Sequence, residues 1–135
     1  MRIAADIHFL HQVLTFIRTE ALRAGLSELE AKRLELACEE IIVNVIDYAY
    51  AGREGEIDVE VTSPAAKEVH VVVSDDGPPF DPLAAQPNPD TDLPLEAREA
   101  GGLGLFLVRQ IVDQLDYERE GERNVVRLTK RSEEP

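Results

Sequence analysis

Three short stretches decide how this chain folds: Glu40-Ile41-Ile42-Val43-Asn44, Asp75-Asp76-Gly77-Pro78-Pro79-Phe80 and Gly101-Gly102-Leu103-Gly104-Leu105. The first places a carboxylate and a carboxamide about one turn apart on the same face of a predicted helix. The second ends a predicted strand with a carboxylate, and the third brings glycines to the start of another helix. Each stretch is weak alone, but their fixed order indicates one site assembled from three parts of the chain.

Apolar residues recur at helical spacing over three segments. The segments are residues 7–24, a stretch that begins at the capping box Ser27-Glu28-Leu29-Glu30 and ends near Tyr50, and residues 104–115. The first segment is followed by Gly25, a typical helix stop. Its apolar members are Ile7, Leu10, Leu14, Ile17 and Ala21.

Strand patterns lie between and after these helices. Residues 56–62 alternate strictly and are expected to end at Ser63-Pro64, and residues 67–75 form the partner strand. Two further strands flank Gly121, and residues 131–135 are expected to fray. The order predicts one α+β domain over residues 1–135. It is a two-layer α/β sandwich with a mixed, mostly antiparallel sheet and its helices on one face.

Composition narrows the class of protein. The chain has 135 residues, 44% of them hydrophobic, and a net charge of -13. Such an acidic chain lacks the clustered cations that bind nucleic acid or anionic membranes directly. No apolar run of about 18 residues and no signal-peptide pattern occurs, so we expect a cytoplasmic protein. Cys38 is the single cysteine and falls in an apolar helical pattern, where a buried, inert thiol is favoured.

Glu40 and Asn44 carry the first candidate chemistry. At their spacing a carboxylate can deprotonate an attacking hydroxyl while a carboxamide oxygen helps to hold Mg²⁺ beside phosphates. An ordinary solvated helix face has the same pattern. The apolar neighbours Ile41, Ile42 and Val45 favour a partly buried cleft instead.

Strand alternation separates the two adjacent aspartates. Asp75 shares a face with Val69, Val71 and Val73, whereas Asp76 lies on the other face. If helices cover the valine face, Asp75 points into the core, where a carboxylate needs a hydrogen-bond donor such as the amine of adenine. The alternative is an aspartate that caps the following turn.

A proline-rich segment separates the second and third stretches. We expect residues 81–101 to form a lid, because long irregular segments in compact domains are usually functional or disordered. The glycines that follow expose backbone N–H groups at a helix N-terminus, an arrangement that suits phosphates. Arg98 and Arg109 flank this turn, and each is also compatible with an ordinary surface position.

These motifs resemble the N, G1 and G2 boxes of the GHKL ATPase superfamily. The longer strings around Glu40, Asp75 and Gly102 resemble one branch of it, the anti-sigma-factor serine/threonine kinases of the RsbW and SpoIIAB type. The resemblance covers roughly residues 3–130 and implies the Bergerat ATP-binding fold. It departs from the family pattern at Pro79, at Tyr48, and at Arg98, which lies about two residues out of register.

The resemblance implies a role for each matching residue. Glu40 is the expected general base, Asn44 the Mg²⁺ ligand and Asp75 the adenine contact. The remaining ATP-binding positions are Gly77, Phe80, Arg98, Gly101, Gly102, Leu103, Gly104 and Leu105. The branch phosphorylates a STAS-domain anti-anti-sigma protein, sequesters a sigma factor of RNA polymerase, and commonly forms homodimers.

Two other functions stay open from the sequence. The site could bind ATP or ADP only to gate a protein partner, or hydrolyse ATP, without kinase activity. The catalytic domain of a histidine kinase is disfavoured, because His8 and His11 lie on the first helix of the domain itself. The leading strand is also short, Arg2 to Ala4 at most, which puts a dimer built on that sheet edge in question.

Overall fold

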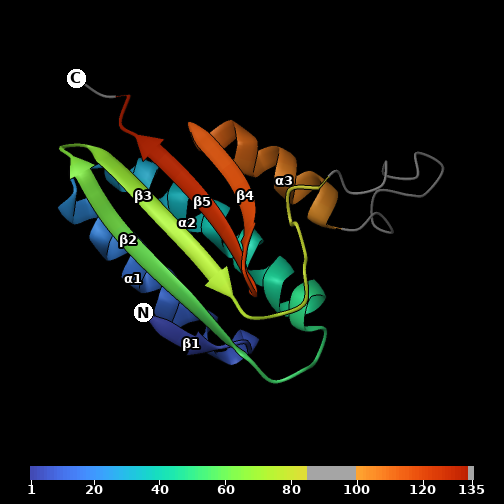
Figure 1. Ribbon diagram of the computed structural model, residues 1–135. Helices are drawn as coiled ribbons and strands as arrows, with labels where there is room; N and C mark the ends of the chain where they lie inside the picture. The colour runs from blue at the N-terminus through green and yellow to red at the C-terminus, as the bar shows by residue number, and fades with distance from the viewer. Residues whose placement is uncertain (85–99, 134–135) are drawn as a thin grey trace.

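A computed structural model describes residues 1–84 and 100–133 of the chain (Figure 1). Helices and strands come in separate runs, as is typical of an α+β fold. In chain order they are β1 (Arg2–Ala4), the short 3-10 helix η1 (Ile7–Phe9), α1 (Leu10–Arg23), α2 (Glu28–Asn44), the π-helix η2 (Val45–Tyr50), β2 (Glu56–Ala65), β3 (Glu68–Asp75), α3 (Ala100–Ile111), β4 (Gln114–Glu120) and β5 (Arg123–Arg131).

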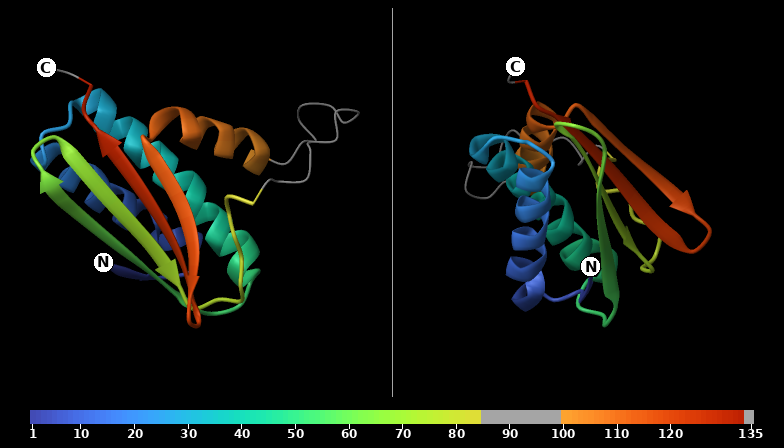
Figure 2. Two further views of the ribbon diagram at one scale, coloured as in Figure 1. Left: turned by 45° about the horizontal axis from the view of Figure 1, so that its top comes forward. Right: turned by 90° about the vertical axis from the view of Figure 1, so that its left-hand side faces the viewer.

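The five described strands form one sheet in the order β1-β2-β3-β5-β4, and every described pairing is antiparallel. The helices of the described residues all lie on one face of this sheet (Figure 2). The inward side chains of β3 and β5 form the centre of the core, where Val71 pairs with Leu128 and Val73 with Val126. The predicted two-layer α+β sandwich is therefore confirmed.

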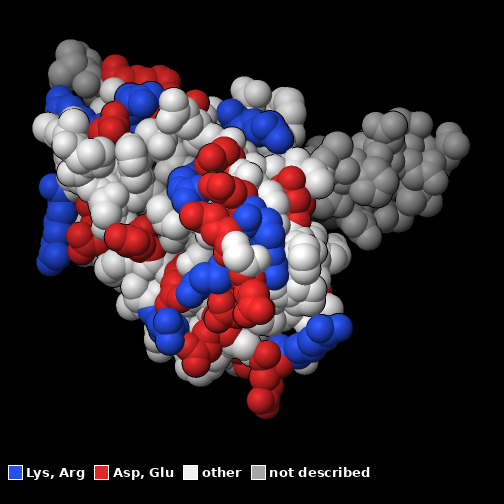
Figure 3. Space-filling view, in the orientation of Figure 1, with Lys and Arg blue, Asp and Glu red and all other residues white. Residues whose placement is uncertain are grey.

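The open face of the sheet is charged, as the alternating pattern predicts (Figure 3). The carboxylate of Asp58 forms ion pairs with Arg2 and Arg123, each at 2.7 Å. At the other end of the sheet Arg131 pairs with Glu68, also at 2.7 Å. Figure 3 shows these charges as a band across the sheet face, where paired cations and carboxylates suit contact with water.

The second helix begins at the predicted capping box. Ser27 Oγ accepts from the backbone N–H of Glu30, and the Glu30 carboxylate accepts from the backbone N–H of Ser27. That carboxylate is 6% exposed and also accepts from Ser132 Oγ and the Glu133 N–H. Burial raises the pKa of Glu30, but these bonds outweigh it and lower the pKa to about 2.

Four local expectations were wrong. The third helical segment ends at Ile111 rather than at residue 115, because Gln114 and Leu115 begin β4. The strand β2 continues through Pro64, which lies where the ladder to β3 is irregular between Thr62 and Ala65 and tolerates a missing N–H. Ile7 is 56% exposed, because it opens a 3-10 turn rather than the core stripe of α1. Residues 131–133 do not fray, because Arg131 ends β5 and the Glu30 carboxylate accepts from Ser132 and Glu133.

Among the described residues, no helix is both long enough and apolar enough to cross a lipid bilayer. Cys38 is buried, and burial raises the pKa of its thiol to about 12. The thiol is therefore protonated and unreactive at neutral pH, as the apolar pattern predicts.

Candidate functional site

The helix α2 presents Glu40 and Asn44 side by side at its C-terminal end. Asn44 is 4% exposed, and its Nδ2 donates a long hydrogen bond of 3.4 Å to Glu40 Oε1. Burial raises the pKa of Glu40, and the nearby Glu39 raises it further, while the bond from Asn44 lowers it. The shift raises the basicity of this carboxylate toward neutral pH.

The helix α3 lies directly on Glu40. A Cβ placed on Gly104 would overlap the Glu40 carboxyl group, so any other residue here would displace the carboxylate from its position. Figure 1 shows α3 running back along α2, with its first turn at the C-terminal half of that helix. The first and third predicted stretches therefore meet, and the contact runs between backbone and carboxylate.

The glycines of the third stretch lie inside the helix rather than before it. The helix begins at Ala100, so Gly101, Gly102 and Leu103 belong to its first turn and Leu105 is buried. The predicted lid over 81–101 therefore ends before residue 100. Helical packing against α2 offsets the modest cost of glycine in a helix.

Most of the predicted lid, together with Arg98, lies outside the described residues. Its beginning is described and is held by a local turn: the carboxylate of Asp81 accepts from the Leu83 N–H at 2.8 Å. Arg109 Nη2 reaches the Leu83 carbonyl at 3.5 Å, so this arginine touches the start of the segment.

Asp75 ends β3 with its side chain in the core, as strand alternation predicts. It is 1% exposed, and its Oδ1 accepts from the Gly77 N–H and from Asn124 Nδ2, each at 2.9 Å. Burial raises the pKa of Asp75, and the bonds from Asn124 and Gly77 counteract the rise. Both alternatives hold in part, because the carboxylate faces the core and also caps its own turn.

The loop that follows Asp75 packs on the continuation of α2. A Cβ on Gly77 would come within 3.4 Å of the Ala49 carbonyl oxygen and 2.9 Å of Asp75 Oδ1. The ring of Phe80 lies 6.0 Å from the ring of Tyr48, centre to centre. The second stretch thus contacts η2 at Tyr48 and Ala49. Since η2 continues α2 directly after Asn44, these two helices together contact all three stretches.

Two residues of this site were missed by the sequence analysis. Asn124 is 1% exposed and lies opposite Asp75 in the β3–β5 register. The Tyr50 hydroxyl donates to the Glu56 carbonyl and accepts from the Asp76 N–H. An asparagine near the start of the last strand, on the same face as Val126 and Leu128, was the available signal for the first, but its partner depends on strand register.

The donor set fits one Mg²⁺ held together with phosphates. In the described part of the chain, no group of three or more His, Cys, Asp or Glu side chains could hold a metal ion. Mg²⁺ commonly takes one or two protein oxygens and completes its shell with water and substrate phosphates. The buried carboxamide of Asn44 beside Glu40 offers such an oxygen.

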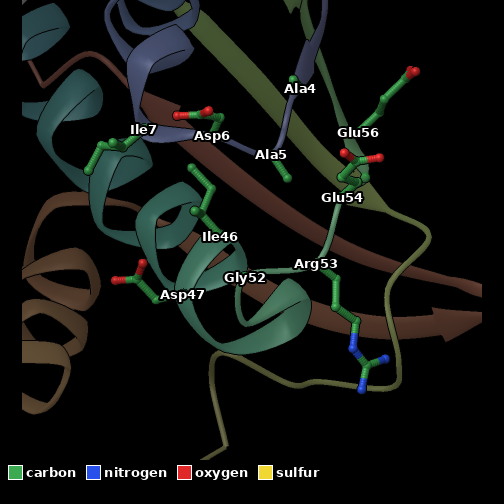
Figure 4. Close-up of a pocket in the computed structure, with 11 residues that line it drawn as sticks. Ala4, Ala5, Asp6, Ile7, Ile46, Asp47, Gly52, Arg53, Glu54 and Glu56 are labelled. Carbon is green, nitrogen blue, oxygen red and sulfur yellow. The ribbon is translucent and has the colours of Figure 1, made fainter.

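A cavity of about 910 Å³ opens elsewhere, between η1, the end of η2 and the loop before β2 (Figure 4). Four carboxylates line it, from Asp6, Asp47, Glu54 and Glu56, with Arg53 as the one cation. None of the predicted site residues lines this cavity. Its carboxylates would repel a polyphosphate, so it does not compete with the site around Glu40 and Asp75.

This chain is similar to known proteins along most of its length. Residues 3–130 match the family model of the histidine kinase-like ATPase domain. The serine-protein kinase RsbW of Listeria monocytogenes is 38% identical over 106 residues, which cover 75% of this chain and 67% of that protein. The serine-protein kinase RsbW of Bacillus cereus is 26% identical over 118 residues, covering 85% of this chain and 73% of its own length.

Two solved structures share the fold at low sequence identity. A protein of Mycobacterium tuberculosis with RsbU and RsbW domains has a TM-score of 0.61 at 15% identity, covering 100% of this chain and 33% of its own. A blue-light activated histidine kinase of Erythrobacter litoralis has a TM-score of 0.57 at 22% identity, covering 78% of this chain and 31% of its own. This chain thus spans about a third of those proteins. The chain belongs to the histidine kinase-like ATPase family, within which it resembles the RsbW-type serine-protein kinases.

Proposed function

We propose that this protein is an ATP-dependent serine/threonine kinase that acts as an anti-sigma factor. Its phosphoacceptor would be a STAS-domain anti-anti-sigma protein, and its other partner a sigma factor of RNA polymerase, in the cytoplasm. The observation that carries the proposal is the Glu40 carboxylate, held between Asn44 and the backbone at Gly104. A carboxylate fixed beside a nucleotide site suits proton abstraction from a protein hydroxyl.

The assigned base has the required chemistry. Glu40 would accept the proton of the acceptor hydroxyl as that oxygen attacks the γ-phosphorus of ATP and ADP leaves. Partial burial raises the pKa of Glu40, which brings the carboxylate closer to the basicity that proton transfer at neutral pH requires. The tight fit at Gly104 restricts the positions that the carboxylate can take.

The nucleotide would lie between the three stretches. The second oxygen of Asp75 is the proposed acceptor for the adenine amine, with Gly77 and Phe80 beside the base. The first turn of α3, from Gly101 to Leu103, would face the phosphates with its N–H groups, and Gly104 and Leu105 follow it along the helix. Arg98 stays a proposed phosphate contact.

Asn44 is the proposed protein ligand of Mg²⁺. When bound, this ion neutralises charge that develops on the transferred phosphoryl group. The acidic protein has little other means of doing so, because its net charge is -13. Nucleotide binding would therefore depend on Mg²⁺ and on backbone N–H groups rather than on a basic surface.

A transfer experiment tests the proposal. Labelled γ-phosphate from ATP, supplied with Mg²⁺ in extract from the source cells, should appear on one small protein. The Glu40→Gln variant should bind ATP and transfer no label, whereas Asp75→Asn should weaken ATP binding itself. Retained transfer by Glu40→Gln would contradict the assigned base. Label released only as free phosphate, or left on ATP, would favour an ATPase or a nucleotide-gated binding protein.

A further inference from the structure

The side-chain amide of Asn124 can adopt only one orientation. Its Oδ1 accepts from the Phe80 N–H at 3.0 Å, from the Tyr117 hydroxyl at 2.6 Å and from Arg119 Nη1 at 3.2 Å. A flipped amide would place an NH₂ group against the Phe80 N–H and the Arg119 guanidinium, which only donate. The oxygen of Asn124 is therefore fixed on this side and the nitrogen on the other.

The fixed nitrogen is directed at the proposed base contact. Asn124 Nδ2 donates to Asp75 Oδ1 and to the Pro78 carbonyl, each at 2.9 Å. The Gly77 N–H donates to the same Oδ1, so both described donors to Asp75 use one oxygen. Two donors stabilise the charged form of a carboxylate, which can then only accept.

Arg119 ties the loop to the same point. Its Nη1 donates to the Gly77 carbonyl at 2.8 Å as well as to Asn124. The loop from Asp75 to Phe80 is thus held at its start, middle and end by the β4–β5 hairpin. This support is independent of the helices that carry Glu40 and Gly104.

We infer that Asn124 is a positioning residue that keeps Asp75 a hydrogen-bond acceptor and thereby sets a preference for adenine over guanine nucleotides. The inference rests on the proposed function. Because Oδ1 already accepts two hydrogen bonds, Oδ2 of Asp75 is the proposed acceptor for the base. Adenine presents an amine donor at its C6 position, whereas guanine presents a carbonyl acceptor there. Two facing acceptors repel, so a fixed carboxylate rejects guanine.

Equilibrium binding of ATP and of GTP tests this inference. The Asn124→Ala variant should bind ATP about tenfold more weakly than wild type and should change GTP binding less, so that the ATP/GTP preference falls. The control is Leu128→Ala, a buried residue on the same strand that pairs with Val71 away from the loop. It should lower the melting temperature and leave the preference unchanged.

The outcomes separate the inference from the proposed function. Wild-type protein that binds neither nucleotide would refute both. Wild-type protein that prefers ATP, with the same preference in Asn124→Ala, would refute the inference alone. Should Asn124→Ala fail to fold, Tyr117→Phe removes one bond that orients the amide, and the preference should fall about threefold. An unchanged preference in Tyr117→Phe would then overturn the inference.

Discussion

Replacement of Gly104 by alanine should separate the position of the proposed base from the stability of the fold. An added Cβ would overlap the Cδ and Oε1 atoms of the Glu40 carboxyl group and would lie 2.5 Å from Oε2, whereas ordinary van der Waals contact begins at 3.4 Å. The Oε2 atom must therefore retreat by about 0.9 Å, and the Cδ and Oε1 atoms, which overlap more, must retreat further. The retreat is cheap because the atoms in the way end a flexible side chain.

The expected cost is large in catalysis and small in stability. A displacement of about 1 Å of a reacting group can cost on the order of 100-fold in rate. Alanine in place of glycine in a helix interior contributes up to about 1 kcal/mol of stability. We therefore expect Gly104→Ala to transfer phosphate roughly 100-fold more slowly, with an unchanged or higher melting temperature and an intact affinity for ATP.

The assay is phosphate transfer under saturating ATP, with calorimetric binding and thermal unfolding on the same samples. Gln110→Ala, an exposed change on the same helix, serves as the control and should have no effect. The double variant with Glu40→Gln should be no slower than Glu40→Gln alone, because both changes act on one carboxylate. Transfer within threefold of wild type by Gly104→Ala would refute the reasoning.

Three further predictions concern stability. The pKa of Glu40 is raised above its ordinary value of 4.5, so the charged carboxylate at neutral pH destabilises the fold. The Glu40→Gln variant should therefore have a higher melting temperature than wild type at pH 7. This difference should disappear below about pH 4.5, where the carboxyl group is protonated in both the folded and the unfolded state. Glu30 is the opposite case, because its pKa is lowered to about 2 and its charged form stabilises the fold above pH 4.5. Urea unfolding at pH 7 should show Glu30→Gln to be about 2 kcal/mol less stable than wild type. This difference should vanish as the pH falls towards 2. Tyr50→Phe leaves the Asp76 N–H without its partner and should cost about 1–3 kcal/mol in the same assay, whereas an unchanged midpoint would show that the bond is replaced by water.

Much of the candidate site follows from local rules. Helical spacing put Glu40 and Asn44 on one face, and strand alternation put Asp75 rather than Asp76 into the core; the structure agrees on both. The capping box at Ser27 marked the start of α2. Each of these features depends on residues within a few positions of one another, where the period of the backbone decides direction.

Contacts between distant segments could not be predicted in the same way. The hydrogen bond between Glu30 and Ser132 depends on where the last strand ends. The effect of Pro64 on β2 depends on the hydrogen bonds that its position would make to β3. In both cases the answer comes from the neighbouring element rather than from the residue itself.

The sequence by itself determined the class of fold, the three stretches and the family. Tertiary structure alone decided that Gly104 lies on the Glu40 carboxylate and that Asn124 lies opposite Asp75. The physical reason is that side-chain direction is set by the local helix or strand, whereas a partner many residues away is set by register and helix packing. Those two properties are fixed only when the whole core has formed.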